Sequence, residues 1–579
     1  MERAMNEAIF IFSLGPVQGF IAEARRVGDL DAGSEVLKRL SRAAGQAIQD
    51  NGGTLIYPAH LHDDVPNKLV ARVSYERIET LAQAAEGAIK EEWQKYVSTA
   101  HAFLVTHGPH PDERWNVIWE RQTGTFWEIY WAAAPLDRDY ATAYKNASRA
   151  FNATKRTRVF PQVKEEGVKD SLGGQRSALR TATLRAAQYW AQVAASPNVT
   201  QAALRPEGRE RLDALGAIKR WGGLTKGSPS VSHIAAANFL AAAKEYPETL
   251  NMYRGTAENL LRDRRYCVSN DPAWPYDGDL LFKETLTEGR LVDNYGLVDP
   301  HEGYLEAARQ ALSALHKKVD CPLSPYYAFI VFDGDGIGEM VSKCESEEEH
   351  QAFSKMLLDF ARQAQENIVE YSAHPVYVGG DDVLALASFS QALPLVQTLA
   401  ERFASAVDGG TASAGVAIAH HLHPLDATLS AARAAERQAK RVEGKATLCV
   451  RVLRRSGEQV DARSPWTGIG DTFDTLIAFF REGALSSKLP YAVAEAAYAL
   501  PKPNDALEAE LKRLLGRHHD PEKWSESETE WAERLRAWAE NLPEPAEQKG
   551  EHLSGGINQT EELARWLALA RFMAQGGGE

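Results

Sequence analysis

Cysteine is scarce in this sequence: its 579 residues include four cysteines, and no two of them form a C-x-x-C pair. The four are Cys267, Cys321, Cys344 and Cys449. Neither a zinc knuckle nor a disulfide framework is therefore indicated. The scattered cysteines favour a reducing compartment, and we expect a cytoplasmic protein.

Long hydrophobic runs are also lacking. No apolar stretch approaches the roughly 20 residues that span a bilayer. The apolar segment near the N-terminus is short, follows mixed charges and has no small-residue cleavage site. We expect a first β-strand there, no signal peptide and no contact with a membrane.

Positive charge is in deficit. The sequence has 65 Lys and Arg against 79 Asp and Glu, which gives a formal net charge of -14. Because nucleic-acid binding depends on clustered Lys and Arg, this balance argues against a protein that coats nucleic acid by itself. Any such contact is expected to be local or shared with partner subunits.

The order of predicted elements repeats along the chain. The N-terminal strand, helices, the strands in "GTLIYPA" and "KLVARV", a helix at about 78–96 and the strand in "TFWEIYWAAAP" follow the order βαββαβ. This order is typical of a ferredoxin-like plan. After residue 322 it returns in the strand of "YYAFIVFDGDGIGEM", a helix with Ser346 and Glu349 at capping-box spacing, the hairpin "HPVYVGGDDVLALA", a helix and the strand "TASAGVAIAH". An Ala-rich helix and the strand "ATLCVRVL" follow.

We therefore predict an α+β protein of four parts. Residues 1–138 form a first βαββαβ unit, and residues 139–322 form a mostly helical middle domain with basic stretches. Residues 323–455 form a second βαββαβ unit, and residues 456–579 form a C-terminal helical domain. The two units are an internal repeat in architecture, and only the second has aligned carboxylates.

Three aspartates mark the second unit: Asp333 at the end of its first strand, and Asp381 and Asp382 in the hairpin turn. Asp333 and Asp381 are 48 positions apart (381 minus 333), about the length of a strand, a helix and a return strand. Three carboxylates at one sheet edge repel one another, so a cation is expected among them. Oxygen-only ligands indicate Mg²⁺ or Mn²⁺. Two such ions support nucleotidyl transfer, so these aspartates are predicted to be both catalytic and metal-binding.

Glycines and lysines around the aspartates fit a nucleotide site. Gly379 and Gly380 permit a sharp turn and a close approach of substrate. The glycines of "FDGDGIGEM" can present backbone N–H groups to phosphates, and lysines near "RVEGKA" can neutralise a triphosphate. The predicted substrate-binding residues here are Gly334, Asp335, Gly336, Gly379, Gly380, Lys440 and Lys445.

Other interpretations were weighed against these. "GGDD" alone is often an ordinary hairpin turn, but its combination with "DGD" at a strand end favours a site. "HHLH" (His420, His421 and His423) could bind metal, but no carboxylate or Cys accompanies it at ligand spacing, and a solvated loop is expected. "HDD" at 62–64 and "HHD" at 518–520 are expected to be surface loops.

At these motifs the sequence resembles the large polymerase-palm subunit of type III CRISPR effector complexes, in particular the Cmr (subtype B) branch. The resemblance rests on "SLGPVQGFIAEARRVGDLDAGS", "ATKRTRVFPQVKEEGVKDSLGG", "LDALGAIKRW", "FDGDGIGEM" and "VGGDDVLAL". It implies two palm domains, a place in a ribonucleoprotein with guide RNA, target RNA and other effector subunits, and RNA-activated synthesis of cyclic oligoadenylates from ATP. It places the metal-binding positions on Asp333, Asp381 and Asp382, and adds Gly33 and Ser34 of the first palm to the substrate-binding residues.

Two departures from the family pattern limit what the resemblance implies. Many relatives begin with an HD nuclease domain, whereas the first palm here starts within about ten residues of Met1, so DNA cleavage is not expected. Relatives often have a zinc-binding C-x-x-C where this sequence has Asp170 and Gly173, so zinc is not expected.

Two rival functions remain open. A catalytically silent subunit that only supports RNA and other subunits would not turn over ATP. A diguanylate cyclase would use GTP, and its signature continues with Glu and Phe after G-G-D, where this sequence has Asp382 and Val383.

Overall fold

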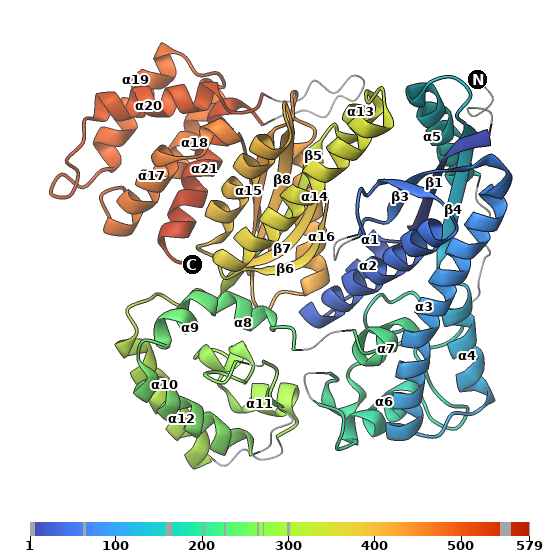
Figure 1. Ribbon diagram of the computed structural model, residues 1–579. Helices are drawn as coiled ribbons and strands as arrows, with labels where there is room; N and C mark the ends of the chain where they lie inside the picture. The colour runs from blue at the N-terminus through green and yellow to red at the C-terminus, as the bar shows by residue number, and fades with distance from the viewer. Residues whose placement is uncertain are drawn as a thin grey trace.

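The computed structural model describes residues 6–61, 65–157, 165–200, 203–224, 227–262, 266–269, 271–297, 302–544 and 557–577. Two β-sheets and many helices make up this mixed α/β chain (Figure 1). Within these ranges, no helix is long and apolar enough to cross a membrane. The "HDD" segment at 62–64 and part of the basic stretch at 158–164 lie outside the described residues.

The first sheet has four antiparallel strands in the order β2-β3-β1-β4. This is the strand order of a ferredoxin-like unit, so the predicted fold class is confirmed. The elements are β1 (Glu7–Gly15), α1 (Gln18–Ala22), α2 (Val27–Asp50), β2 (Thr54–Tyr57), β3 (Lys68–Ser74), α3 (Ile78–His107), α4 (Glu113–Gly124) and β4 (Glu128–Pro135).

Both faces of the first sheet are buried. Side chains alternate along a strand, and Phe10 and Phe12 of β1 pack into one core with residues of α2 and α3. Ile9 and Ile11 point the other way, into a core that includes α5 (Tyr140–Arg156) and the interior of the second unit. The two sheets are thus joined through shared apolar packing.

The second sheet has six strands in the order β10-β9-β8-β5-β7-β6. Its part β8-β5-β7-β6 repeats the strand order of the first sheet, and β9 and β10 extend it beyond β8. The elements are β5 (Tyr326–Asp335), α13 (Ile337–Ser342), α14 (Glu347–Glu370), β6 (His374–Gly379), β7 (Asp382–Ser388), α15 (Ala392–Ala406), β8 (Thr411–His420), α16 (Leu425–Ala439), β9 (Thr447–Leu453) and β10 (Gln459–Pro465).

The structure tests two sequence predictions about the second unit and the chain that follows it. Ser346 caps α14, and its Oγ accepts the backbone N–H of Glu349 at 3.1 Å, as predicted. The prediction that the chain after residue 455 is helical is wrong for β10, which pairs antiparallel with β9. Its sequence "QVDARSP" has few apolar residues, because a strand at a sheet edge needs backbone pairing more than side-chain burial.

The remaining helices lie beside the sheets, with the middle helices below both sheets in the view of Figure 1. The C-terminal group lies on the side of the second sheet away from the first unit. The middle helices are α6 (Ala186–Ala195), α7 (Ala214–Trp221), α8 (Val231–Ala235), α9 (Ala237–Ala243), α10 (Pro247–Leu261), α11 (Glu288–Tyr295) and α12 (Glu302–Lys318). The C-terminal helices are α17 (Asp471–Glu482), α18 (Leu489–Ala499), α19 (Asp505–His518), α20 (Glu528–Glu540) and α21 (Gln559–Ala574).

A buried ion-pair cluster joins α7 of the middle region to the start of α2. Arg220 is 3% exposed and bonds Asp29 at 2.9 Å and Glu210 at 3.1 Å. Glu210 also pairs with Arg26 at 2.6 Å. Arg220 of the basic stretch "LDALGAIKRW" is thus buried, and its ion pairs hold α7 against the start of α2.

The loop at Asp170 and Gly173, where the sequence lacks a C-x-x-C, is held by hydrogen bonds. The Asp170 carboxylate accepts the backbone N–H groups of Leu172 at 2.8 Å, Gly173 at 2.7 Å and Arg176 at 3.2 Å. A Cβ at Gly173 would lie 3.0 Å from the side chain of Glu23. Asp170 therefore organises this loop from within the chain.

Candidate active site

Two neighbouring strands bring the three predicted aspartates to one end of the second sheet. β5 pairs with β7 up to Phe332 and Val383, so Asp333, the next residue of β5, lies beside the start of β7 at Asp382. Gly379 pairs with Asp382, which leaves Gly380 and Asp381 as the two-residue turn. The N–H of Gly334 donates to the carbonyl of Asp381 at 3.3 Å and ties the strand end to this turn.

The electrostatics confirm that like charges gather here. Burial raises the pKa of Asp381 to about 7, and the neighbouring Asp333 carboxylate adds to the shift. The pKa of Asp382 is raised well above its ordinary value by burial, by a hydrogen bond with Asp333 and by the charge of Asp381. Asp382 nevertheless keeps part of its surface exposed to solvent. The carboxylates therefore favour a cation between them.

Lys440 is the cation that the chain itself supplies. Its ammonium bonds the carboxylate of Asp333 and that of Glu436, the latter at 2.9 Å. Burial alone would lower the pKa of Lys440, but these hydrogen bonds outweigh burial and raise it. Lys445, in contrast, is exposed in the turn before β9. Lys440 thus neutralises part of the charge of Asp333 and Glu436, and the guanidinium of Arg433 is near enough for its charge to act on Asp382 and Glu436.

Glycine is required at two positions of the hairpin. A Cβ at Gly379 would lie 2.1 Å from the hydroxyl of Tyr377, so any side chain there would displace the ring. Gly380 has φ +75°, a conformation that favours glycine. Gly336 precedes α13 at φ +71° with open space around it. Gly336 is partly exposed and leaves its backbone open, whereas Gly379 and Gly380 are buried.

Asp335 is bonded to β8 and to the turn before β9. Its carboxylate accepts the hydroxyls of Thr411 at 3.1 Å and Ser413 at 2.9 Å, and the backbone N–H of Ala446 at 3.0 Å. Ala446 and its neighbour Lys445 both have positive φ, an uncommon conformation for residues other than glycine. Asp335 therefore fixes the turn before β9, and its predicted substrate contact remains a prediction.

Gly33 and Ser34 lie within the buried face of α2. A Cβ at Gly33 would be 3.2 Å from the backbone of Ile21 and 3.6 Å from Lys219. The Oγ of Ser34 is buried, with no hydrogen-bond partner among the described residues. These positions serve the packing of α2 on α1 and α7, and their predicted substrate contact remains a prediction.

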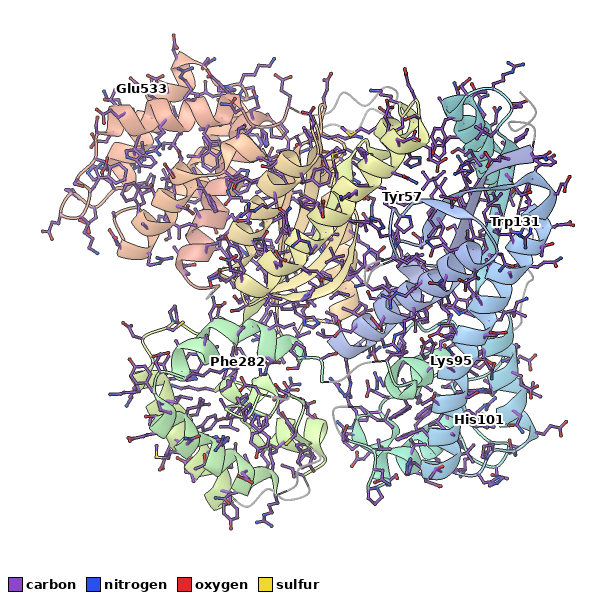
Figure 2. The ribbon with its side chains drawn as sticks, in the orientation of Figure 1. Tyr57, Lys95, His101, Trp131, Phe282 and Glu533 are labelled. Carbon is purple, nitrogen blue, oxygen red and sulfur yellow. The ribbon has the colours of Figure 1, made fainter. Side chains whose placement is uncertain are left out.

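Tyr57 of the first unit is a site residue that the sequence did not reveal. Its hydroxyl lies 3.4 Å from where a Cβ of Gly380 would be, so it touches the aspartate turn. Its pKa is raised well above the ordinary value by burial and by the charge of Asp381. Figure 2 labels Tyr57 where the first sheet faces α14. No local pattern marks it, because Tyr57 and Gly380 are far apart in sequence.

Further contacts hold the first unit against this end of the second. The N–H of Ala59 donates to Ser354 of α14 at 2.9 Å, and Asp31 of α2 accepts from His374 of β6 at 2.9 Å. Arg433 of α16 donates to the carbonyl of Gln18 at 3.4 Å. A cavity of about 590 Å³ also lies between the units, lined among others by residues of β2 and α14, but by none of the predicted site residues.

The expectation of a solvated loop at "HHLH" is wrong for its first two residues. His420 ends β8, and His420 and His421 are each 6% exposed. His421 stacks on Phe282 with ring centroids 4.2 Å apart, and its Nδ1 lies 2.9 Å from the hydroxyl of Ser232. Burial lowers the pKa of His421 to about 3. The pair packs the second sheet on the middle helices.

The donor set fits a hard divalent cation, since all three side chains offer carboxylate oxygens. Within the described ranges, no group of three or more His, Cys, Asp or Glu side chains is already arranged to hold a metal ion. Asp333 is instead bonded to Lys440. Asp333, Asp381 and Asp382 are the residues that would hold such ions.

Comparisons with known proteins match both units. Residues 326–449 match the family model of the Cas10/Cmr2 second palm domain, and residues 9–65 match that of the CRISPR-associated protein Cmr2 N-terminal region. The CRISPR system Cmr subunit Cmr2 of Pyrococcus furiosus is 28% identical over 247 residues. That alignment covers 37% of this chain and only 27% of the relative.

Solved structures share the whole fold. The type III-B Cmr-beta structure in the apo state matches with a TM-score of 0.67 at 12% identity, over 100% of this chain and 82% of that one. The Cmr-beta structure bound to cognate target RNA matches with a TM-score of 0.65 at 12% identity, over 99% and 83%. Residues 326–449 thus carry a Cas10/Cmr2 second palm domain, residues 9–65 are similar to the Cmr2 N-terminal region, and the chain as a whole is similar to Cmr2 and shares the fold of the Cmr-beta structures.

Proposed function

We propose that this chain is the nucleotidyltransferase subunit of a type III CRISPR ribonucleoprotein, and that it makes cyclic oligoadenylates from ATP when target RNA is bound. The observation that carries the proposal is the meeting of Asp333, Asp381 and Asp382 at one end of the matched palm domain, with Lys440 as their one bonded ammonium. Guide RNA, target RNA and the other effector subunits are the proposed partners.

In the proposed reaction, a ribose 3′-hydroxyl of one ATP attacks the α-phosphorus of another. A new P–O bond forms, the bond to the β-phosphate oxygen breaks, pyrophosphate leaves and the hydroxyl loses its proton. When bound, two Mg²⁺ or Mn²⁺ ions would activate the hydroxyl and stabilise the leaving pyrophosphate. Asp333, Asp381 and Asp382 would hold these ions.

The other residues of the site position the reactants. Gly336 is partly exposed with open space around it, so a phosphate can approach its backbone closely. Gly334, Gly379 and Gly380 are buried, and their predicted substrate contact remains a prediction. Lys440 lies beside Asp333 and is placed to exchange that carboxylate for a phosphate oxygen. Tyr57, which belongs to the first unit, lies against the turn at Gly380 and Asp381 and limits the space beside it. Positioning and charge neutralisation supply most of the catalysis.

The test is mass spectrometry of the products of the assembled complex with guide RNA, target RNA, Mg²⁺ and either ATP or GTP. We expect ring products whose masses are whole multiples of the AMP residue, made from ATP, dependent on target RNA and lost when the metal is chelated. No product from either nucleotide would favour a silent architectural subunit. Product from GTP alone would favour a diguanylate-cyclase-like enzyme.

A further inference from the structure

Helix α5 carries a one-sided positive face in an otherwise acidic protein. Its sequence, "YATAYKNASRAFNATKR", contains four basic residues and no Asp or Glu. The apolar face of the helix packs on the first sheet and the second unit through Tyr140, Ala143, Tyr144, Ala147 and Phe151. The basic side chains lie on the opposite, exposed face.

The exposed residues form a line along the helix. Lys145, Arg149, Asn152 and Arg156 follow the spacing i, i+4, i+7 and i+11, which keeps them on one side of an α-helix. With a rise of about 1.5 Å per residue, the line is about 16 Å long. The charge is therefore spread along an axis, as a repeating polyanion would require, and is not gathered at a point.

These cations are not used by the fold. Lys145, Arg149 and Arg156 are exposed and have no ion-pair partner among the residues that the structure describes. Arg220 and Arg176 elsewhere, in contrast, bond carboxylates. Stabilisation of the helix dipole accounts for basic residues in the last turn only, which leaves Lys145 and Arg149 unexplained. Lys155 lies 4.8 Å from the ring of Phe151 and is held against the helix.

We propose that this face of α5, defined by Lys145, Arg149, Asn152 and Arg156, binds the phosphate backbone of a single-stranded RNA. A stacked strand advances about 3.4 Å per nucleotide, so about five phosphates would run along the helix. The three cations supply the attraction, and the amide of Asn152 can donate a hydrogen bond to a phosphate oxygen. The choice of RNA over DNA rests on the proposed function, whereas the charge complementarity does not.

The test measures binding of fluorescein-labelled oligouridylate to the full chain by anisotropy at several KCl concentrations. The variant Lys145→Gln/Arg149→Gln/Arg156→Gln is compared with Lys90→Gln/Lys317→Gln/Lys512→Gln, which removes three exposed cations from α3, α12 and α19. We expect at least a tenfold loss of affinity in the α5 variant. The slope of log K against log salt should fall in magnitude by about 2, or roughly 0.7 for each lost contact. The control should bind like the wild type, and both variants should keep the wild-type thermal midpoint.

Three results would overturn the proposal. The first is that the wild type does not bind oligouridylate. The second is that both variants lose the same amount of affinity for it. The third is that the α5 variant loses affinity for oligothymidylate DNA but not for oligouridylate. The assay contains no ATP, and Asp381→Asn/Asp382→Asn should bind RNA like the wild type. Absence of cyclic product therefore argues against the proposed function alone, and unchanged binding in the α5 variant argues against this inference alone.

Discussion

Replacing Asp381 and Asp382 together with Asn is expected to lower product formation at least about a thousandfold, the loss typical when a preorganised charge is removed from an active site. The substitution keeps the shape of both side chains and removes both charges. Because wild-type Asp381 and Asp382 lie beside Asp333, neutralising them relieves like-charge repulsion. We therefore expect a thermal midpoint equal to or above that of the wild type, measured beside product yield by mass spectrometry.

The matched control is Asp359→Asn/Asp408→Asn, which removes two exposed carboxylates from the same unit. It should leave both product yield and thermal midpoint unchanged. A structural role for the turn would instead lower the midpoint of the Asp381 and Asp382 variant. Product at the wild-type rate in that variant would show that the chemistry does not depend on these carboxylates.

Replacing Arg220 with Ala is expected to have the largest effect on stability. The guanidinium of Arg220 is 3% exposed and bonds Asp29 and Glu210, whose side chains are 2% and 5% exposed. Removing one member of a buried ion pair leaves its partners charged and unpaired, which costs about 3–5 kcal/mol. Urea unfolding followed by tryptophan fluorescence measures the loss. The exposed pair Arg513 with Glu510 provides the control, since Arg513→Ala should not shift the transition measurably.

The same cluster predicts how stability depends on pH. Burial would raise the pKa of Asp29 and Glu210, but Arg220, together with other nearby charges and backbone N–H groups, outweighs burial and holds both below their ordinary values of 3.8 and 4.5. Their stabilising contribution is thus complete above those values and is lost as pH falls through the lower folded values. Without Arg220, burial dominates, and the variant should instead gain stability as pH falls toward 5. A wild-type pH dependence in the variant would mean that Arg220 does not set these pKa values.

Local sequence patterns predicted much of this structure but did not predict its long-range contacts. The order βαββαβ and the aspartates at strand ends follow from periodicity and turn chemistry, which neighbouring residues determine. Tyr57 reaches the site only because two units pack face to face. His420 and His421 are polar in sequence, yet they are buried where a third segment covers them. Asp335 lies within the glycine-rich motif but is turned toward β8 by Thr411 and Ser413.

The central claim is that Asp333, Asp381 and Asp382 hold the metal ions of a nucleotide site. Electron paramagnetic resonance can count the Mn²⁺ bound to the full chain in the presence of a non-hydrolysable ATP analogue. The account predicts two Mn²⁺ per wild-type chain and fewer in Asp381→Asn/Asp382→Asn, with the Asp359→Asn/Asp408→Asn control equal to the wild type. Equal Mn²⁺ binding by the wild type and the Asp381→Asn/Asp382→Asn variant would contradict it.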